Sequence, residues 1–185
     1  MEVKLLKQSI HYSGKELRPH WILENFNIRG DAAVSFRGSC SVLTEDLVDI
    51  EDSLDEATIA ADDMLHFICE HFIHTSLALT IMRQRALASI ATELVTELSG
   101  VVPKRIGNDI FVDESKLSVS IATVSPVSGL IHFGVNVSNE GTPVPTACLD
   151  DMDIEPTEFA ETMLDRYRHE IESLPRDLSK VRPRC

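Results

Sequence analysis

Hydrophobic and polar positions alternate with a period of two through much of the second half of the chain. In residues 116–124 the alternation gives an apolar face and a polar face, formed by Leu117, Val119 and Ile121 and by Ser118 and Ser120 respectively. Residues 130–138 repeat it, with Ile131, Phe133, Val135 and Val137 on the apolar face and His132, Gly134 and Asn136 on the other. Residues 109–112 come before a turn at 113–115, so the pattern predicts three antiparallel strands.

A spacing of three and four residues, typical of a buried helix face, governs two other regions. Apolar residues recur at positions 87, 90, 91, 94, 95 and 98, and Gly100 is placed as a C-cap. Ser53 and Glu56 have the spacing of a capping box, and Met64 to Leu98 is nearly free of helix breakers. We therefore expect two helices with a bend near residues 74–76. A final helix is predicted to begin at Pro156, with one apolar stripe formed by Phe159, Met163, Tyr167, Ile171 and Leu174.

The first fifty residues predict shorter elements. We expect strands at residues 2–8, 31–36 and 47–52, a short helix at 19–26 and a small-residue loop at 37–41. The consecutive hairpins of the second half argue against a doubly wound parallel sheet. The predicted class is therefore α+β, a mostly antiparallel sheet with helices packed on one face, and residues 1–185 are expected to form a single domain.

The net charge of the chain limits the kinds of molecule that it is expected to bind. The formal net charge is −13 at pH 7, which disfavours a broad nucleic-acid-binding surface. An anionic small-molecule ligand is instead expected at local cations such as Arg37, Arg105 and Lys116. No segment has the length of a membrane span and the first residues lack a signal-peptide core, so a cytoplasmic protein without membrane association is expected. The four cysteines are too widely spaced to indicate a disulfide framework.

His66, Glu70 and His74 lie four residues apart on the first of the two predicted helices. On a helix this spacing can place metal ligands on one face, which would suit a metal-dependent hydrolase. The surrounding Phe and Ile residues are more typical of a buried segment in which His and Glu pair along the helix edge. The metal site is therefore kept as an alternative hypothesis.

Residues 105–118, with the pattern R-x-G-N-D-I-x-V-D-x-x-K-L-S, resemble the central signature of lipoate–protein ligases and their biotin-ligase relatives. The following GLIHFGVNVS is similar to the next strand of those enzymes, and SFRGSCSV at 35–42 lies where they carry a loop rich in Arg and Gly. The whole chain resembles more closely an uncharacterised domain-of-unknown-function family (number 366) assigned to the same superfamily. This resemblance implies a class II aminoacyl-tRNA synthetase-like fold, as in biotin and lipoate ligases.

The resemblance also implies a pocket for a small carboxylate, acyl group or nucleotide, with acyl or adenylate transfer as the reaction and ATP with Mg²⁺ as cofactors. Lys116 would neutralise charge on a phosphate and on an attacked carbonyl oxygen. Cys40 is the candidate acyl-accepting nucleophile, with a buried small residue as the alternative. Asp49 and Glu51 share a face of the predicted strand at 47–52 and could hold Mg²⁺, or could simply favour the helix that follows. The ligand-binding candidates are Arg37, Gly38, Ser39, Arg105, Asn108, Asp109, Ser118, His132 and Asn136.

Some features depart from the ligase pattern. Val119 stands where the ligases usually carry a Gly close to the ligand, and the segment 37–41 contains less glycine. Asn108 and Asp109 are also ordinary turn formers after Gly107, and Lys116 could be a solvated hairpin residue. A non-catalytic ligand-binding or regulatory module on the same fold is therefore the alternative function. A homodimer is expected because relatives of this fold often pair and because the apolar helical stretch is long.

Overall fold

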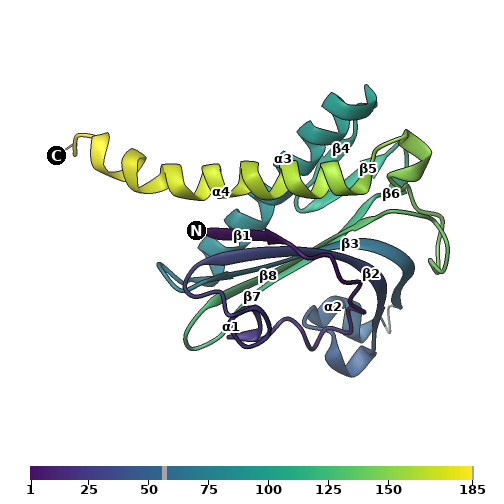
Figure 1. The fold of residues 1–185 in the computed structure, drawn as a ribbon, viewed down its shortest axis with the longest axis horizontal. Coiled ribbons are helices and arrows are strands. Elements are labelled where there is room, and N and C mark those ends of the chain that lie inside the picture. The colour runs from purple at the N-terminus through teal and green to yellow at the C-terminus, as the bar shows by residue number, and fades with distance from the viewer. Residues whose placement is uncertain (56–57, 185) are drawn as a thin grey trace.

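The main sheet has five strands in the order β1-β2-β3-β8-β7 (Figure 1). In the computed structural model, which describes residues 1–55 and 58–184, these strands are β1 (Glu2–Leu5), β2 (Ala32–Val42), β3 (Ile59–His71), β7 (Ser118–Val124) and β8 (Gly129–Asn136). β1 pairs in parallel with β2, and the other neighbouring strands of this sheet pair antiparallel. The predicted α+β class with a mostly antiparallel sheet is confirmed.

Two long helices, α3 (Leu77–Ser99) and α4 (Pro156–Lys180), cover one face of the sheet (Figure 1). α3 follows Ser76, whose hydroxyl accepts the N–H of Leu79 at 3.2 Å, and it ends at Gly100, which has the left-handed backbone of a C-cap. α4 begins at Pro156 as predicted, and its stripe buries Phe159, Met163 and Tyr167. The main hydrophobic core lies between these helices and the sheet.

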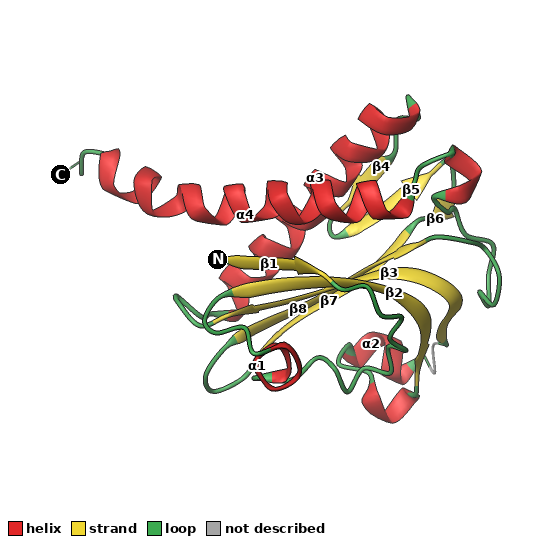
Figure 2. Cartoon of the chain, in the orientation of Figure 1, coloured by secondary structure: helices red, strands yellow, loops and turns green. Residues whose placement is uncertain are grey.

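A second, three-stranded sheet contains β4 (Lys104–Ile106), β5 (Asp109–Val112) and β6 (Ser115–Lys116) (Figure 2). Leu117 joins β6 to β7, with its side chain buried in the main core. After this break the alternation starts again. Ser118 lies opposite Val135, whose side chain is in the main core, and Val119 lies opposite Gly134 on the other face. Leu117 and Val119 therefore do not share a face, contrary to the prediction, and Ser118 faces the helices.

The other face of the sheet carries two short helices, α1 (Trp21–Phe26) and α2 (Ile50–Leu54) (Figure 2). A second cluster of buried side chains lies on this face and includes Trp21, Phe36 and Ile68. Val119 packs against this second cluster and not against the main core. Side chains of β7 and β8 on this face are therefore separated from α3 and α4 by the sheet itself.

β3 replaces the first of the two predicted helices. It pairs with β2 on one side and β8 on the other, and it is buried on both faces from Met64 to His71. Apart from His66, residues 64–69 are apolar on both faces, so the segment lacks the alternation that marks a half-buried strand. The bend expected at residues 74–76 is the connection between β3 and α3, where His74 has a φ of 55°.

Residues 37–53 also differ from the prediction. β2 continues to Val42 with an irregularity in register between Gly38 and Cys40, so the predicted loop is a strand. The second half of the predicted strand at 47–52 belongs to α2, which Asp49 caps by accepting the N–H of Glu51 at 2.9 Å. Ser53 lies inside that helix, and its expected partner Glu56 lies outside the described residues, so the predicted capping box stays a prediction.

Within residues 1–55 and 58–184, no helix combines the length and the apolar character needed to cross a membrane. Cys40, Cys69 and Cys148 are buried free thiols. Burial raises the pKa of all three, which disfavours the reactive thiolate form.

Candidate functional site

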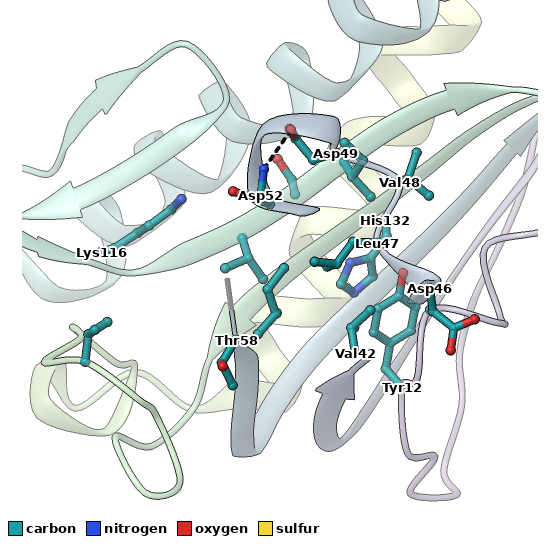
Figure 3. Close-up of a pocket in the computed structure, with 16 residues that line it drawn as sticks. Tyr12, Val42, Asp46, Leu47, Val48, Asp49, Asp52, Thr58, Lys116 and His132 are labelled. Carbon is teal, nitrogen blue, oxygen red and sulfur yellow. Dashed lines mark hydrogen bonds between the residues drawn. The ribbon is translucent and has the colours of Figure 1, made fainter. Parts of the chain in front are cut away.

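A cavity of about 240 Å³ lies on the sheet face opposite α3 and α4 (Figure 3). Val119 and Ile121 of β7 and His132 of β8 line it from the sheet side. Much of the remaining wall is apolar and includes Leu47, Val48, Ile59 and Val144. A concave, mostly apolar site with a few polar groups is the usual form of a small-molecule site.

Lys116 stands at one end of this cavity (Figure 3). β6 holds it opposite Phe111 of β5, and its Nζ lies 2.9 Å from Oδ1 of Asp109. The side chains of Lys116 and Asp109 are 39% and 32% exposed, so water screens their attraction. A second cavity of about 100 Å³ also borders Lys116, beside Val144 and Asn136. Lys116 is thus a partly exposed cation between two cavities.

Asp49 and Asp52 bring negative charge to the same cavity (Figure 3). Both come from the α2 segment, where a spacing of three residues places them on one side of a helix. Burial and the neighbouring Asp49 raise the pKa of Asp52, and Lys116 acts in the opposite direction. Glu51 is exposed and does not line the cavity, so Asp49 and Glu51 are not the pair on one strand face that the sequence predicted. Among the residues that the structure describes, no group of three or more His, Cys, Asp or Glu side chains is arranged for a metal ion.

His132 and Tyr12 occupy the opposite end of the cavity (Figure 3). Their rings stack with centroids 3.7 Å apart, and Nε2 of His132 lies 3.0 Å from Nδ1 of His66. Burial lowers the pKa of His66 to about 4 and holds the pKa of His132 well below its usual value. Both imidazoles are therefore neutral at pH 7.

The four candidates from β2 lie outside this cavity. Arg37 is exposed and pairs with Asp63, with Nε 2.8 Å from Oδ1. Gly38 packs closely against the backbone of Ile10, and the Ser39 hydroxyl is hydrogen-bonded to the ring of His11 at 2.8 Å. Cys40 is buried, and burial raises the pKa of its thiol to about 12. This environment suits a core residue, because a nucleophilic cysteine needs an accessible thiolate.

Three further candidates hold the scaffold of the site together. The Asn108 side chain donates to Ser120 Oγ at 3.1 Å, and Ser118 Oγ accepts the N–H of Ile110 at 3.2 Å. Asn136 donates its side-chain amide to the carbonyl oxygens of Ala147 at 3.1 Å and Lys116 at 3.3 Å. Asn136 also lines the second cavity.

Arg105 lies away from the cavity on exposed β4 and donates to the carbonyl oxygen of Gly107. Of the three local cations expected to attract an anionic ligand, only Lys116 lines the 240 Å³ cavity. The sequence alone could not separate them, since all three lie beside turns or small residues.

The three residues of the proposed metal stripe do not converge. His66 and Glu70 are buried on β3, whereas His74 is exposed beyond its end. A carboxylate oxygen of Glu70 accepts the N–H of His20 at 2.8 Å and the hydroxyl of Ser128 at 2.8 Å. These contacts satisfy buried polar groups within the fold.

Tyr12 and Asp52 are cavity residues that the sequence did not single out. Asp52 carried a signal in its spacing from Asp49, but the segment was predicted as a strand. Tyr12 reaches the cavity because residues 6–12 run beside β2, with the Tyr12 N–H donating to the carbonyl oxygen of Ser39 at 2.9 Å. No local pattern around Tyr12 indicated that contact.

Comparisons with other proteins identify relatives along the whole chain. The model of the family described as Domain of unknown function (DUF366) matches residues 1–182. Uncharacterized protein MJ0805 of Methanocaldococcus jannaschii is 35% identical over 189 residues, which cover 99% of this chain and 85% of that protein. A solved structure, Protein of Unknown Function from Pyrococcus horikoshi, is 41% identical with a TM-score of 0.94 and covers 100% of this chain and 99% of that chain.

More distant solved structures share the fold. The biotin protein ligase of Aquifex aeolicus in complex with biotin and ATP has a TM-score of 0.58 at 15% identity, covering 94% of this chain and 70% of that one. Protein Ta0514 of T. acidophilum, with bound lipoic acid, has a TM-score of 0.62 at 13% identity, covering 93% of this chain and 87% of that one. These likenesses establish the class II synthetase-like fold of the biotin and lipoate ligases.

Proposed function

The chain belongs to the family described as Domain of unknown function (DUF366), and from that premise we propose that it binds a small carboxylic acid or its acyl derivative in the cavity beside Lys116. The apolar walls would receive the hydrocarbon part of the ligand, and the amine of Lys116 would neutralise its carboxylate. The observation that carries the proposal is the position of Lys116. It is the one lysine or arginine among the described residues that line this cavity, in a fold shared with the biotin ligase of Aquifex aeolicus.

The ion pair with Asp109 leaves room for this role. A lysine ammonium has three hydrogen-bond donors, and one of them is directed at Asp109 Oδ1 at 2.9 Å. The remaining donors can bind a ligand carboxylate. Because both partners of the ion pair are about one-third exposed, the cost of rearranging it is small.

Activation of the bound acid would use ATP with Mg²⁺, as the complex of the Aquifex aeolicus ligase with biotin and ATP suggests. Asp49 and Asp52 fit a role near a hydrated Mg²⁺, since both line the cavity. Burial, and after it the negative charge of Asp49, raises the pKa of Asp52, and a cation would offset that charge. When bound, ATP would supply the reactive anhydride for acyl or adenylate transfer. Lys116 would orient the carboxylate and offset its charge.

The test is thermal unfolding of the purified protein with octanoate, lipoic acid or biotin, each with and without ATP and Mg²⁺. A ligand at about 100 times its Kd should stabilise the protein by about 2.7 kcal/mol. Lys116→Ala should abolish this stabilisation, whereas Lys104→Ala, which removes an exposed lysine of β4, should preserve it. If none of these acids shifts the unfolding of the wild-type protein, the proposal fails.

Binding without turnover is the second candidate function. Two observations favour it: the buried Cys40 offers no accessible nucleophile, and the side chain of Val119 occupies the cavity wall. Mass spectrometry of the protein incubated with the stabilising acid, ATP and Mg²⁺ separates the two. Release of AMP or an acyl-adenylate would support the transferase, and unchanged ATP beside a bound acid would support the binding module.

A further inference from the structure

The buried end of the cavity contains a chain of hydrogen bonds that starts at a backbone carbonyl. Nε2 of His66 lies 3.2 Å from the carbonyl oxygen of Gly38, and Nδ1 of His66 lies 3.0 Å from Nε2 of His132. His66 and His132 are 0% and 3% exposed. Each contact requires one donor and one acceptor, so the positions of the protons are linked along the chain.

The carbonyl oxygen of Gly38 fixes the direction of this chain. A carbonyl accepts only, so Nε2 of His66 must carry the proton. Nδ1 of the neutral His66 is then an acceptor, and Nε2 of His132 must donate to it. The proton of neutral His132 is consequently on Nε2, which leaves Nδ1 of His132 with a free lone pair.

Nδ1 of His132 has no hydrogen-bond partner among residues 1–55 and 58–184, and the imidazole lines the cavity. The hydroxyl of Tyr12, whose ring stacks on His132, lies at the same end, and so does Asp46 (Figure 3). Gly134 allows Met64 and the His132 ring to pack closely against β8, because a Cβ there would lie 2.8 Å from Met64 and 3.4 Å from the His132 ring. The buried end thus presents the lone pair of His132 Nδ1 and the carboxylate of Asp46 as acceptors, beside the Tyr12 hydroxyl, which can donate or accept.

We propose that the buried end of the cavity selects ligands whose inner part carries a neutral N–H or O–H donor, which donates to Nδ1 of His132. The inference rests on the proposed function, since it describes the other end of the same ligand. A charged group would lose its hydration in a wall formed mainly by apolar groups, and an unprotonated carboxylate would also lie at the same end as the carboxylate of Asp46. A cyclic amide or urea, or an alcohol, fits this end, and the acid group belongs at Lys116.

The first test is NMR spectroscopy of the full-length protein with ¹⁵N-labelled histidine at pH 7. The expected result is that His66 and His132 are both neutral with the proton on Nε2. A proton on Nδ1 of His132 would overturn the proposal, since that nitrogen would then be a donor. This measurement uses the wild-type protein, so it does not depend on how well any variant folds.

The second test uses two probes that differ in one hydrogen-bond donor, oxindole and 1-methyloxindole. Wild-type protein should bind oxindole about tenfold more tightly, because the methylated probe leaves the buried acceptor unpaired. His132→Phe keeps an aromatic ring against Tyr12 and should bind the two probes equally. Tyr12→Phe should retain the preference, and its loss there would transfer the acceptor role to the Tyr12 hydroxyl and overturn the assignment.

The two proposals can fail separately. Oxindole has no carboxylate, so Lys116→Ala should change its affinity less than twofold. If no carboxylic acid binds but oxindole still binds more tightly than 1-methyloxindole, the proposed function is wrong and the acceptor role of His132 is retained. Equal affinities for the two probes, or binding of neither, would overturn the acceptor site whatever the acids do.

Discussion

At one end of the cavity the imidazoles of His66 and His132 are buried and neutral, whereas at the other end Lys116 and Asp109 are charged and about one-third exposed. The buried end is held by hydrogen bonds and ring stacking between buried side chains. The charged end is held by an ion pair that water screens. The comparison indicates that a change at the buried end should lower the free energy of unfolding. At the charged end, the side chain of Lys116 can rearrange around a ligand with little loss of stability.

The largest expected effect comes from Gly38, whose carbonyl anchors the buried end. A Cβ at this position would lie 2.0 Å from the carbonyl oxygen of Ile10, so the backbone of residues 6–12 would have to move. Gly38→Ala should lower the free energy of unfolding by about 3 kcal/mol or more, as measured by urea denaturation. Gly30→Ala is the control: it has a φ of 80° and open space around it, so a loss of about 1 kcal/mol is expected. Equal losses for the two variants would contradict the close packing of Gly38.

A smaller effect is expected from acid. Burial lowers the pKa of His66 to about 4, so the unfolded chain binds the proton more tightly than the folded protein does. The stability is complete above the unfolded pKa near 6.5 and is lost as the pH falls toward 4. Between pH 7.5 and pH 5, His66 alone should reduce the free energy of unfolding by about 2 kcal/mol, and His132 acts in the same direction.

Urea denaturation across this pH range measures the effect. The double variant His66→Phe and His132→Phe retains aromatic rings at both positions and should show a clearly shallower pH dependence. An unchanged slope in the double variant would mean that the buried end is not the source of the acid sensitivity.

The charged end should contribute little to stability. Lys116→Ala should lower the free energy of unfolding by less than about 1 kcal/mol, because the pair with Asp109 is partly exposed. The same denaturation experiment checks this. A loss as large as that of Gly38→Ala would show that Lys116 is part of the structural framework and would remove the contrast between the two ends.

The smallest expected effect concerns the partner of Lys116. Asp109→Asn removes the competing carboxylate, so a bound acid should gain about threefold in affinity. Isothermal titration with the acid that stabilises the wild-type protein measures this change. Weaker binding in Asp109→Asn would indicate that Asp109 holds the amine in position and does not compete with the ligand.

Much of the fold could be predicted from local patterns. The alternation in β8, the apolar spacing of α3 with Gly100 after it, and Pro156 at the start of α4 were each read correctly. The two helices have one buried and one more exposed face. β8 is buried throughout, but it alternates because one of its faces carries His132, Gly134 and Asn136. β3 was misread because both of its faces carry apolar residues at consecutive positions, which leaves no alternation. This correction also removes one of the two reasons for expecting a homodimer, since part of the long apolar helical stretch is a strand.

The cavity was less predictable than the fold. Lys116, Asp49 and His132 were among the candidates, and all three line it. The part of the cavity wall formed by Tyr12 was not predicted. It depends on a parallel pairing of Tyr12 with Cys40, which lies far away in the sequence and which no local pattern indicates. The orientation of Ser118 was also not predicted. β7 begins only after Leu117, whose N–H donates to the carbonyl oxygen of Ile110, and this contact is defined by the tertiary structure.

The amide of Asn136 ties the end of β8 to Ala147 and to the backbone of Lys116. The wall of the cavity near Val144 is therefore held in place before a ligand binds, so binding should cost little additional conformational entropy there. By contrast, the backbone hydrogen bonds described for residues 43–55 stay within that segment. A ligand of unusual width would be accommodated on the side of Leu47 and Asp52, so differences in ligand size among related proteins should be sought in the sequence of that segment.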